Sequence, residues 1–169
     1  MENNFLDFET FADESRTWIY QSNRNFSLEE VDTIEKLLND FCIQWTAHNN
    51  QLRAAGKIFY KRFIVLMVDK NLHDASGCSI DKSIHYLKEI ESKFNIQLFN
   101  RLEIAYEEAG EIKTFSLSQF NNFIEQKIIS PSTIIFNNAI STKKEMNENW
   151  KIRLEDSWQK KFLNNEITA

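Results

Sequence analysis

The chain has 169 residues and a formal net charge of −5, with 42% hydrophobic and 27% charged side chains. This length and balance are typical of one globular domain and exclude a disordered chain. The acidic excess gives no general attraction to nucleic acid or to an anionic membrane, so we expect neither as a partner. The longest apolar run, Phe63 to Val68, is too short to span a membrane.

The numbers of cysteines and glycines exclude several kinds of binding site. Cys42 and Cys78 are too few for a disulfide framework or a zinc site, and no metal is expected. The polar, acidic start has no secretory signal, which favours the cytoplasm. The three glycines form none of the motifs that cradle phosphates or dinucleotides, so the sequence predicts no cofactor.

The first half predicts alternating strands and helices. The acidic first 16 residues are expected to form a short helix or a docked arm, and 17–21 reads as a strand. Ser27 and Glu30 form a capping box that begins an amphipathic helix, which we expect to end near 48–50. Residues 51–69 read as extended and finish in a buried central strand. Whether 51–60 is a separate strand, or the turn falls at Ala55-Gly56, stays open.

A second amphipathic helix follows the polar loop 69–79, and a hairpin of 101–106 with 111–115 follows that helix. The order matches the βαββαβ pattern of ferredoxin-like folds. We therefore predict an α+β protein with a ferredoxin-like core at about 17–117, an extra hairpin strand and a C-terminal helical extension at about 118–169, all within the single domain 1–169.

The extension is expected to contain a helix near 116–127, a short strand at 133–136 and a long charged helix at 142–163. In that last helix Trp150, Leu154 and Trp158 would share one face, because they are spaced by four residues. Such a stripe is expected to dock on the domain, since large exposed apolar patches are uncommon on monomers.

The loop that leads into the second helix is the most chemically suggestive segment. Cys78 lies beside the free amides of a helix N-terminus, which favour a thiolate and hence a nucleophilic or redox thiol. The same amides, with the ligand-binding candidates Ser76, Gly77, Ser79 and Asp81, could bind a phosphate or carboxylate instead. Ser79, or alternatively Ser76, would cap the helix. In the plainer interpretation this segment is a strand-to-helix turn and Cys78 a small buried hydrophobe.

A catalytic thiol also needs a base and an orienting group. His48 and Asp69 are the candidate catalytic partners of Cys78, with His73 and His85 as further histidines; Asp74 and Lys82 lie close in sequence. Arg101 is a candidate anion ligand. None of these residues has diagnostic spacing, and acidic residues at strand ends are commonly solvated.

Two stretches together resemble a known family. They are Trp18-Ile19-Tyr20-Gln21 leading to Trp45-Thr46-Ala47-His48, and Phe63-Ile64-Val65-Leu66 through Asp69 to the segment Ser76-Gly77-Cys78-Ser79-Ile80-Asp81-Lys82-Ser83. The family comprises small bacterial proteins with no established activity, some automatically labelled "ABC transporter ATPase". The resemblance covers roughly 17–106. It directs attention to Trp45 and Arg101 along with the residues above, but this chain has no P-loop to support an ATPase.

Two functions remain open. The first is a binding or assembly module whose sheet pairs with an unknown protein partner or with itself, as in a homodimer. The second is a small thiol-dependent enzyme, or a protein that binds a small anionic ligand, centred on Cys78. The absence of a complete catalytic set favours the module.

Overall fold

The computed structural model describes residues 6–164, which fold into two compact units. The first unit contains the residues up to Phe99 together with Asn138–Asn147, and the second contains Asn100–Asn137 and the residues from Glu148 onward. Both units combine helices with antiparallel strands, which confirms a mixed α+β protein. No helix in the described part of the chain has the length and apolar character that a membrane crossing needs. The single-domain organisation stays a prediction.

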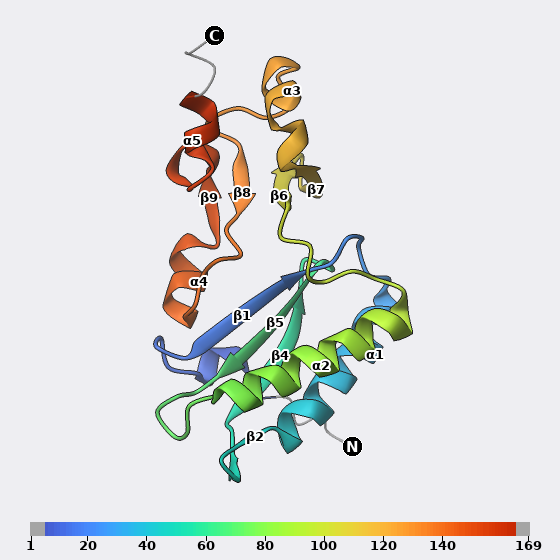
Figure 1. The fold of residues 1–169 in the computed structure, drawn as a ribbon, viewed down its shortest axis with the longest axis vertical. Helices are drawn as coiled ribbons and strands as arrows, with labels where there is room; N and C mark the ends of the chain where they lie inside the picture. Colours follow the sequence, from blue (N-terminus) through green and yellow to red (C-terminus); the bar gives the residue numbers. More distant parts are fainter. Residues whose placement is uncertain (1–5, 165–169) are drawn as a thin grey trace. The chain divides into compact units, whose positions relative to one another are not determined.

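The first unit is built on a three-stranded antiparallel sheet with the order β1-β5-β4 (Figure 1). Its strands are β1 (Arg16–Gln21), β4 (Ala54–Phe59) and β5 (Phe63–Val68). Every residue of β5 is buried, which confirms the predicted central strand covered on both faces. The open question about 51–60 is also answered. A separate strand, β4, ends at Phe59, and the turn begins at Tyr60 and Lys61, which both have positive φ.

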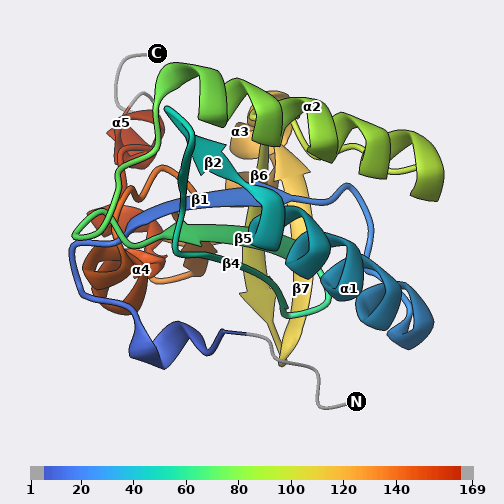
Figure 2. The ribbon, with the colours of Figure 1, turned by 90° about the horizontal axis from the view of Figure 1, so that it is seen from below.

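Two long helices, α1 (Leu28–Gln44) and α2 (Gly77–Phe94), cover one face of this sheet (Figure 2). Alternation along β5 turns Ile64, Leu66 and Val68 toward the helices, where they join Leu38 of α1 and Leu87 of α2 in one core. The predicted capping box of α1 is present. Ser27 Oγ accepts the Glu30 N–H at 3.1 Å, and the Glu30 carboxylate accepts the Ser27 N–H at 2.9 Å.

The predicted end of α1 was wrong, because the helix stops at Gln44. A small hairpin of β2 (Thr46–Ala47) and β3 (Asn50–Gln51) follows, with His48 and Asn49 at positive φ in its turn. The Gln51 amide donates to the carbonyls of Cys42 and Trp45, both at 3.3 Å. The Gln51 side chain thus adds a second donor to two carbonyls that also accept the N–H groups of Trp45 and Leu52, and it ties the hairpin to the end of α1.

The N-terminal arm is fixed to the first unit by buried contacts. It contains a short 3-10 helix, η1 (Phe8–Thr10), and Phe8 packs on Phe59 with ring centroids 5.8 Å apart. Lys143, at the start of α4 (Lys143–Asn149), is buried and donates to the carbonyls of Glu9 at 3.2 Å and Phe11 at 2.9 Å. The prediction of a docked arm with a short helix is therefore confirmed for its described residues, which begin at Leu6.

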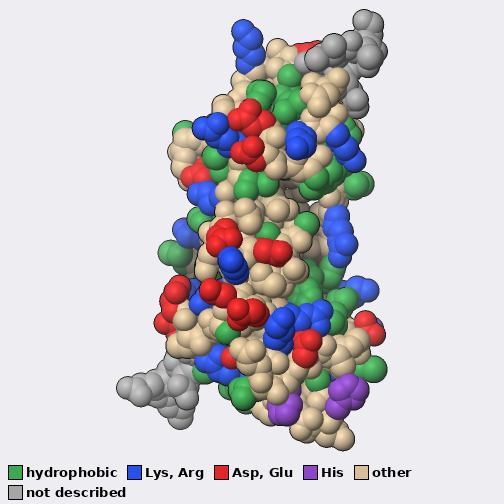
Figure 3. Space-filling view, turned by 90° about the vertical axis from the view of Figure 1, so that its left-hand side faces the viewer, with side chains coloured by type: hydrophobic (Ala, Val, Ile, Leu, Met, Phe, Trp, Pro, Cys, Tyr) green, Lys and Arg blue, Asp and Glu red, His purple; other side chains and the backbone are tan. Residues whose placement is uncertain are grey.

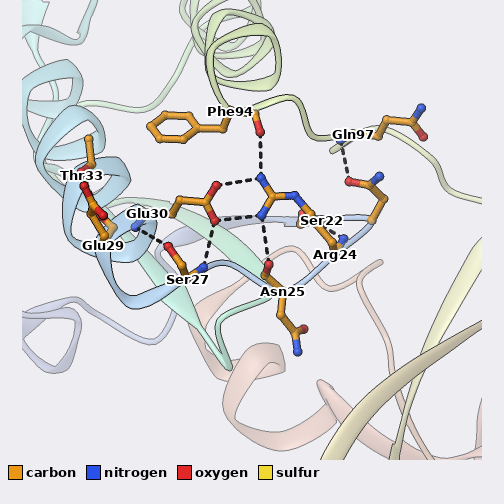
Figure 4. A network of polar contacts seen from close by, with 10 residues as sticks. Ser22, Arg24, Asn25, Ser27, Glu29, Glu30, Thr33, Phe94 and Gln97 are labelled. Carbon is orange, nitrogen blue, oxygen red and sulfur yellow. Dashed lines mark hydrogen bonds and ion pairs between the residues drawn. The ribbon is translucent and has the colours of Figure 1, made fainter.

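A polar network fastens the segment between β1 and α1 (Figure 4). Arg24 forms two hydrogen bonds with Glu30, at 2.7 and 2.8 Å, and donates to the Phe94 carbonyl at 2.8 Å. Arg62, only 8% exposed, donates to the carbonyls of Ser22 and Asn23. The arginine–glutamate pair therefore joins the beginning of α1 to the end of α2.

The second unit is built on a four-stranded antiparallel sheet with the order β7-β6-β8-β9. Its strands are β6 (Glu103–Glu108), β7 (Glu111–Ser116), β8 (Ile134–Phe136) and β9 (Lys151–Arg153). Ala109 and Gly110 form the predicted turn between β6 and β7, both at positive φ. The unit's helices are η2 (Leu117–Gln119), α3 (Phe120–Glu125), η3 (Leu154–Asp156) and α5 (Lys160–Leu163).

Two predictions need different treatment. β6 pairs with β7 and β8 in the second sheet, so the specific ferredoxin-like topology is not confirmed. The long helix at 142–163 was wrong, because α4, β9, η3 and α5 occupy that range. Trp150 is buried in the bend between α4 and β9 and Leu154 is buried in η3, whereas Trp158 is half exposed. Pairing of β9 with β8 outweighs the helical spacing of these side chains.

The close approach of α1 to β4 predicts a cost for Gly56→Ala. A Cβ at Gly56 would lie 2.9 Å from Leu38 Cβ and 3.0 Å from Leu66 Cδ2, so we expect a loss of about 1–3 kcal/mol in unfolding free energy. Gly77→Ala is the matched control, because its new methyl meets nothing within 4 Å. Urea denaturation measures both variants; equal stabilities would contradict the packing described.

The Arg24–Glu30 pair predicts a pH dependence of stability. The hydrogen bond from Arg24, and next that from Ser27, lowers the pKa of Glu30 to about 2. Since this pKa lies below that of an unfolded chain, about 4.3, the stabilisation is present above about pH 4.3 and is lost as pH falls toward 2. Glu30→Gln should cost about 1–2 kcal/mol at pH 7 and reduce the loss of stability on acidification.

Glu29→Gln is the control for that measurement, since it removes one charge from the same helical turn but leaves the bonds to Arg24 intact. Urea unfolding between pH 2 and 7 compares the two variants with the parent chain. If both variants lose stability with pH as the parent does, the ion pair does not govern acid unfolding.

Candidate functional site

The predicted site lies where β5 leads through a loop into α2. Ser76 is the N-cap of α2, and its Oγ accepts the Ser79 N–H at 3.2 Å. Ser76, which the sequence offered as the alternative to Ser79, is therefore the residue that caps α2. Gly77 and Cys78 follow in the first turn and are exposed. The thiol of Cys78 is accessible to solvent, which excludes the interpretation of this residue as a buried hydrophobe.

Ser79 has a different position from its neighbours. It is 1% exposed, and its Oγ donates to the Ser76 carbonyl at 2.8 Å. Its own carbonyl accepts the buried indole N–H of Trp45 at 2.8 Å. Trp45 also contacts the rings of Phe41 and Trp18. The Trp45 hydrogen bond thus fixes the first turn of α2 against the end of α1, and it brings together two residues singled out by the family resemblance.

Asp69 and Asp74 are held by arginines. Asp69 pairs with Arg53 at 3.0 Å and accepts the Asn71 N–H at 3.1 Å. Asp74 accepts the Ala75 N–H at 2.8 Å and lies 3.4 Å from the Arg16 guanidinium. Both carboxylates therefore stabilise the loop before α2 at its two ends. Groups of three or more histidine, cysteine or acidic residues suited to a metal ion do not occur in the described part of the chain.

The candidate bases do not assemble around the thiol. His48 lies in the turn of the β2–β3 hairpin, His73 in the loop and His85 on α2, and all three are exposed. Within residues 6–164, Cys78 forms no hydrogen bond to any of them or to Asp69. Further site residues, Asp81 and Lys82, are exposed on α2. Arg101 is exposed in the second unit, two residues before β6 begins.

The other cysteine differs sharply from Cys78. Cys42 lies on the inner face of α1 and is 3% exposed. Burial raises the pKa of its thiol to about 12, so Cys42 stays protonated and unreactive in the folded protein.

The sequence did not predict which strands lie at the edges of the two sheets. The structure shows that these edge strands differ in how their outward backbone groups are covered. The edge of β4 is covered by α1 at Ile58, where the Glu35 carboxylate accepts the Ile58 N–H at 2.9 Å. The edge of β1 is covered at its beginning, where the Thr17 N–H donates to the Ser141 carbonyl at 2.9 Å. In the second unit, β9 is only three residues long. These are three common ways to protect an edge strand.

The edge of β7 has six residues and is mostly open. A two-residue turn makes Glu108 and Glu111 a hydrogen-bonded pair, so the backbone groups of Ile112 and Thr114 point away from β6. The next outward N–H, that of Ser116, donates to Gln119 Oε1 at 3.0 Å, as this alternation requires. In the described chain, Ile112 and Thr114 have no hydrogen bond that would cover these outward groups.

The surface drawn in Figure 3 carries acidic and basic side chains close to one another. This face therefore has no large patch of one sign, and it gives no indication of a polyanion as a partner. Comparison of the chain with protein families, with curated proteins and with solved structures finds no match. The family resemblance of the sequence stays a prediction, and the function has to be inferred from the site and the edges themselves.

The contrast between the cysteines predicts selective alkylation. Iodoacetamide at neutral pH should modify Cys78 in the folded protein and reach Cys42 only after denaturation, because Cys42 is buried and protonated. Intact-protein mass spectrometry should therefore show one adduct on the native chain and two on the unfolded chain. Cys78→Ser should show none in the native state; a native adduct on that variant would contradict the burial of Cys42.

Proposed function

We propose that this protein is a binding or assembly module that pairs the edge strand β7 with an extended strand of a partner. The observation that carries this proposal is the open edge at Ile112 and Thr114, whereas β9 is short and β4 is covered at Ile58. An added strand gains main-chain hydrogen bonds at such an edge, and side chains on alternate positions give specificity. The role requires no catalytic group.

Several properties of the second unit support this role. β7 is anchored along its whole length to β6, from Glu103 opposite Ser116 to Glu108 opposite Glu111. Phe115 is buried in the core of the unit and fixes the face that β7 turns inward. An incoming strand would therefore meet a backbone already held in the extended conformation, and the cost of ordering falls mainly on the partner.

We further infer that the first unit is a ferredoxin-like arrangement that lacks its last strand. Its βαββα element order and its strand order β1-β5-β4 agree with the first five elements of that fold. Residues 141–142 run along the edge of β1, where a further strand would otherwise pair.

A second candidate function centres on Cys78, and the exposure of its thiol in the first turn of the 18-residue helix α2 favours it. The alkylation experiment distinguishes the two functions when its rate is measured on a Cys42→Ala background. A native rate at least about tenfold above that of the unfolded chain would support a thiol-dependent or anion-binding role. Equal rates would leave Cys78 an ordinary surface residue.

Ile112→Pro tests the module directly. Proline removes the outward N–H of Ile112 but none of the hydrogen bonds that join β7 to β6, so the hairpin should persist while strand addition is lost. Ile112→Val keeps the N–H and a branched apolar side chain. In sedimentation from about 1 µM to about 200 µM, where small interfaces dissociate, the parent and the valine variant should associate and the proline variant should stay monomeric.

Circular dichroism and urea unfolding verify that both variants are folded before they are compared. A parent chain that is monomeric over the whole range would contradict the proposal. So would a folded Ile112→Pro variant that associates as strongly as the parent.

A further inference from the structure

The tip of the β6–β7 hairpin has an unusual arrangement of charge. Glu108 and Glu111 lie directly opposite each other in the register of the two strands, an unfavourable placement of like charges. Lys113 forms an ion pair with Glu108. Glu111 is exposed, forms no ion pair in the described part of the chain and shares the influence of Lys113 with Glu108. Two carboxylates therefore share one lysine, on the strand whose edge is open.

The open edge allows only a few pairings with a second copy. A two-fold axis makes an antiparallel pair in which the same surface of each copy meets the other, and such a contact closes without growing into a filament. Hydrogen-bonded pairs must then form between outward-facing residues, namely Ile112, Thr114 and Ser116. The three registers nearest the middle of the strand pair Ile112 with Ile112, Ile112 with Thr114, or Thr114 with Thr114.

Two of these registers are disfavoured by the residues present. Pairing Ile112 with Thr114 of the second copy places Lys113 directly opposite Lys113, which is repulsive. Pairing Thr114 with Thr114 requires the N–H of Ser116, which already donates to Gln119. In the remaining register, Ile112 lies opposite Ile112, and Glu111 of each copy lies opposite Lys113 of the other. This register brings a second lysine to the two carboxylates that share Lys113.

We propose that the partner of β7 is a second copy of this chain, paired antiparallel about a two-fold axis at Ile112, with Glu111 and Lys113 as the residues that set the register. The inference rests on the proposed function and names the strand that the module accepts. It joins two four-stranded sheets into one of eight strands. The contact is small, so the dimer should dissociate in the micromolar range.

Charge reversal tests this register. Glu111→Lys places two lysines opposite Lys113 of the two copies, and Lys113→Glu places two glutamates opposite Glu111. Each variant alone should raise the dissociation constant of the dimer about tenfold or more. The double variant Glu111→Lys/Lys113→Glu should restore it to within about threefold, because it exchanges the charges without changing their pairing.

Mixing the two single variants gives the sharpest result. A chain with lysine at both positions and a chain with glutamate at both positions should repel their own copies but pair with each other, so sedimentation of the mixture should show a heterodimer. Recovery on mixing also shows that both variants are folded, even though Lys113→Glu loses its ion pair with Glu108.

The outcomes separate this inference from the proposed function. Single variants that dimerise as well as the parent, or a mixture that fails to associate, would overturn the register, while loss of association in Ile112→Pro would still support pairing through the β7 edge. If Ile112→Pro has no effect either, both the register and the proposed function are wrong. A parent chain that does not associate overturns both.

Discussion

Every backbone N–H and C=O at the edge of a sheet needs a partner in the protein or in water, and the described edges of this protein meet that requirement in different ways. A carboxylate of α1 covers β4 at Ile58, and a carbonyl of the returning chain covers the start of β1. β9 is kept short. β7 combines length, a fixed register to its neighbour and outward groups at Ile112 and Thr114 without a protein partner among the described residues. These properties are why the second unit, and not the loop before α2, carries the proposed function.

The loop before α2 illustrates how a suggestive local motif can have a mainly structural role. Its aspartates are engaged by Arg53 and Arg16, and Ser79 is buried against Trp45. These contacts hold the beginning of α2 in place. Cys78 remains exposed among them, without a base within hydrogen-bonding distance in the described structure. Cys78 therefore provides an accessible thiol at this position.

The sequence predicted best what is determined locally. The Ser27–Glu30 capping box and the apolar run of β5 depend on neighbours a few residues apart, and both are present. Turns were harder, because Tyr60 and Lys61 adopt positive φ without glycine, stabilised by the strands that they join. The spacing of Trp150, Leu154 and Trp158 suited a helix, but strand pairing with a segment 17 residues upstream decided the structure. Non-local pairing of this kind leaves no periodic signal in one sequence.

The same limit applies to the candidate site. The exposed cysteine and its helix could be located from residue types alone. The engagement of Asp69 by Arg53, and of Ser79 by Trp45, joins residues 16 and 34 positions apart through the fold. The outward direction of Ile112 and Thr114 follows from the register of a two-residue turn, which becomes certain only once Glu108 and Glu111 are known to be paired.

The first unit is assembled from two separated stretches of chain, and this has a consequence during synthesis. The N-terminal arm and the start of β1 are completed by Lys143 and Ser141, which leave the ribosome long after Phe99. At translation rates of about 5–20 residues per second, the intervening chain takes about 2–10 s to appear. During that interval the Thr17 N–H at the edge of β1 lacks the Ser141 carbonyl, and the Phe11 carbonyl lacks the Lys143 ammonium. Its folding is therefore tied to the appearance of 138–147, after the whole β6–β8 segment has been made.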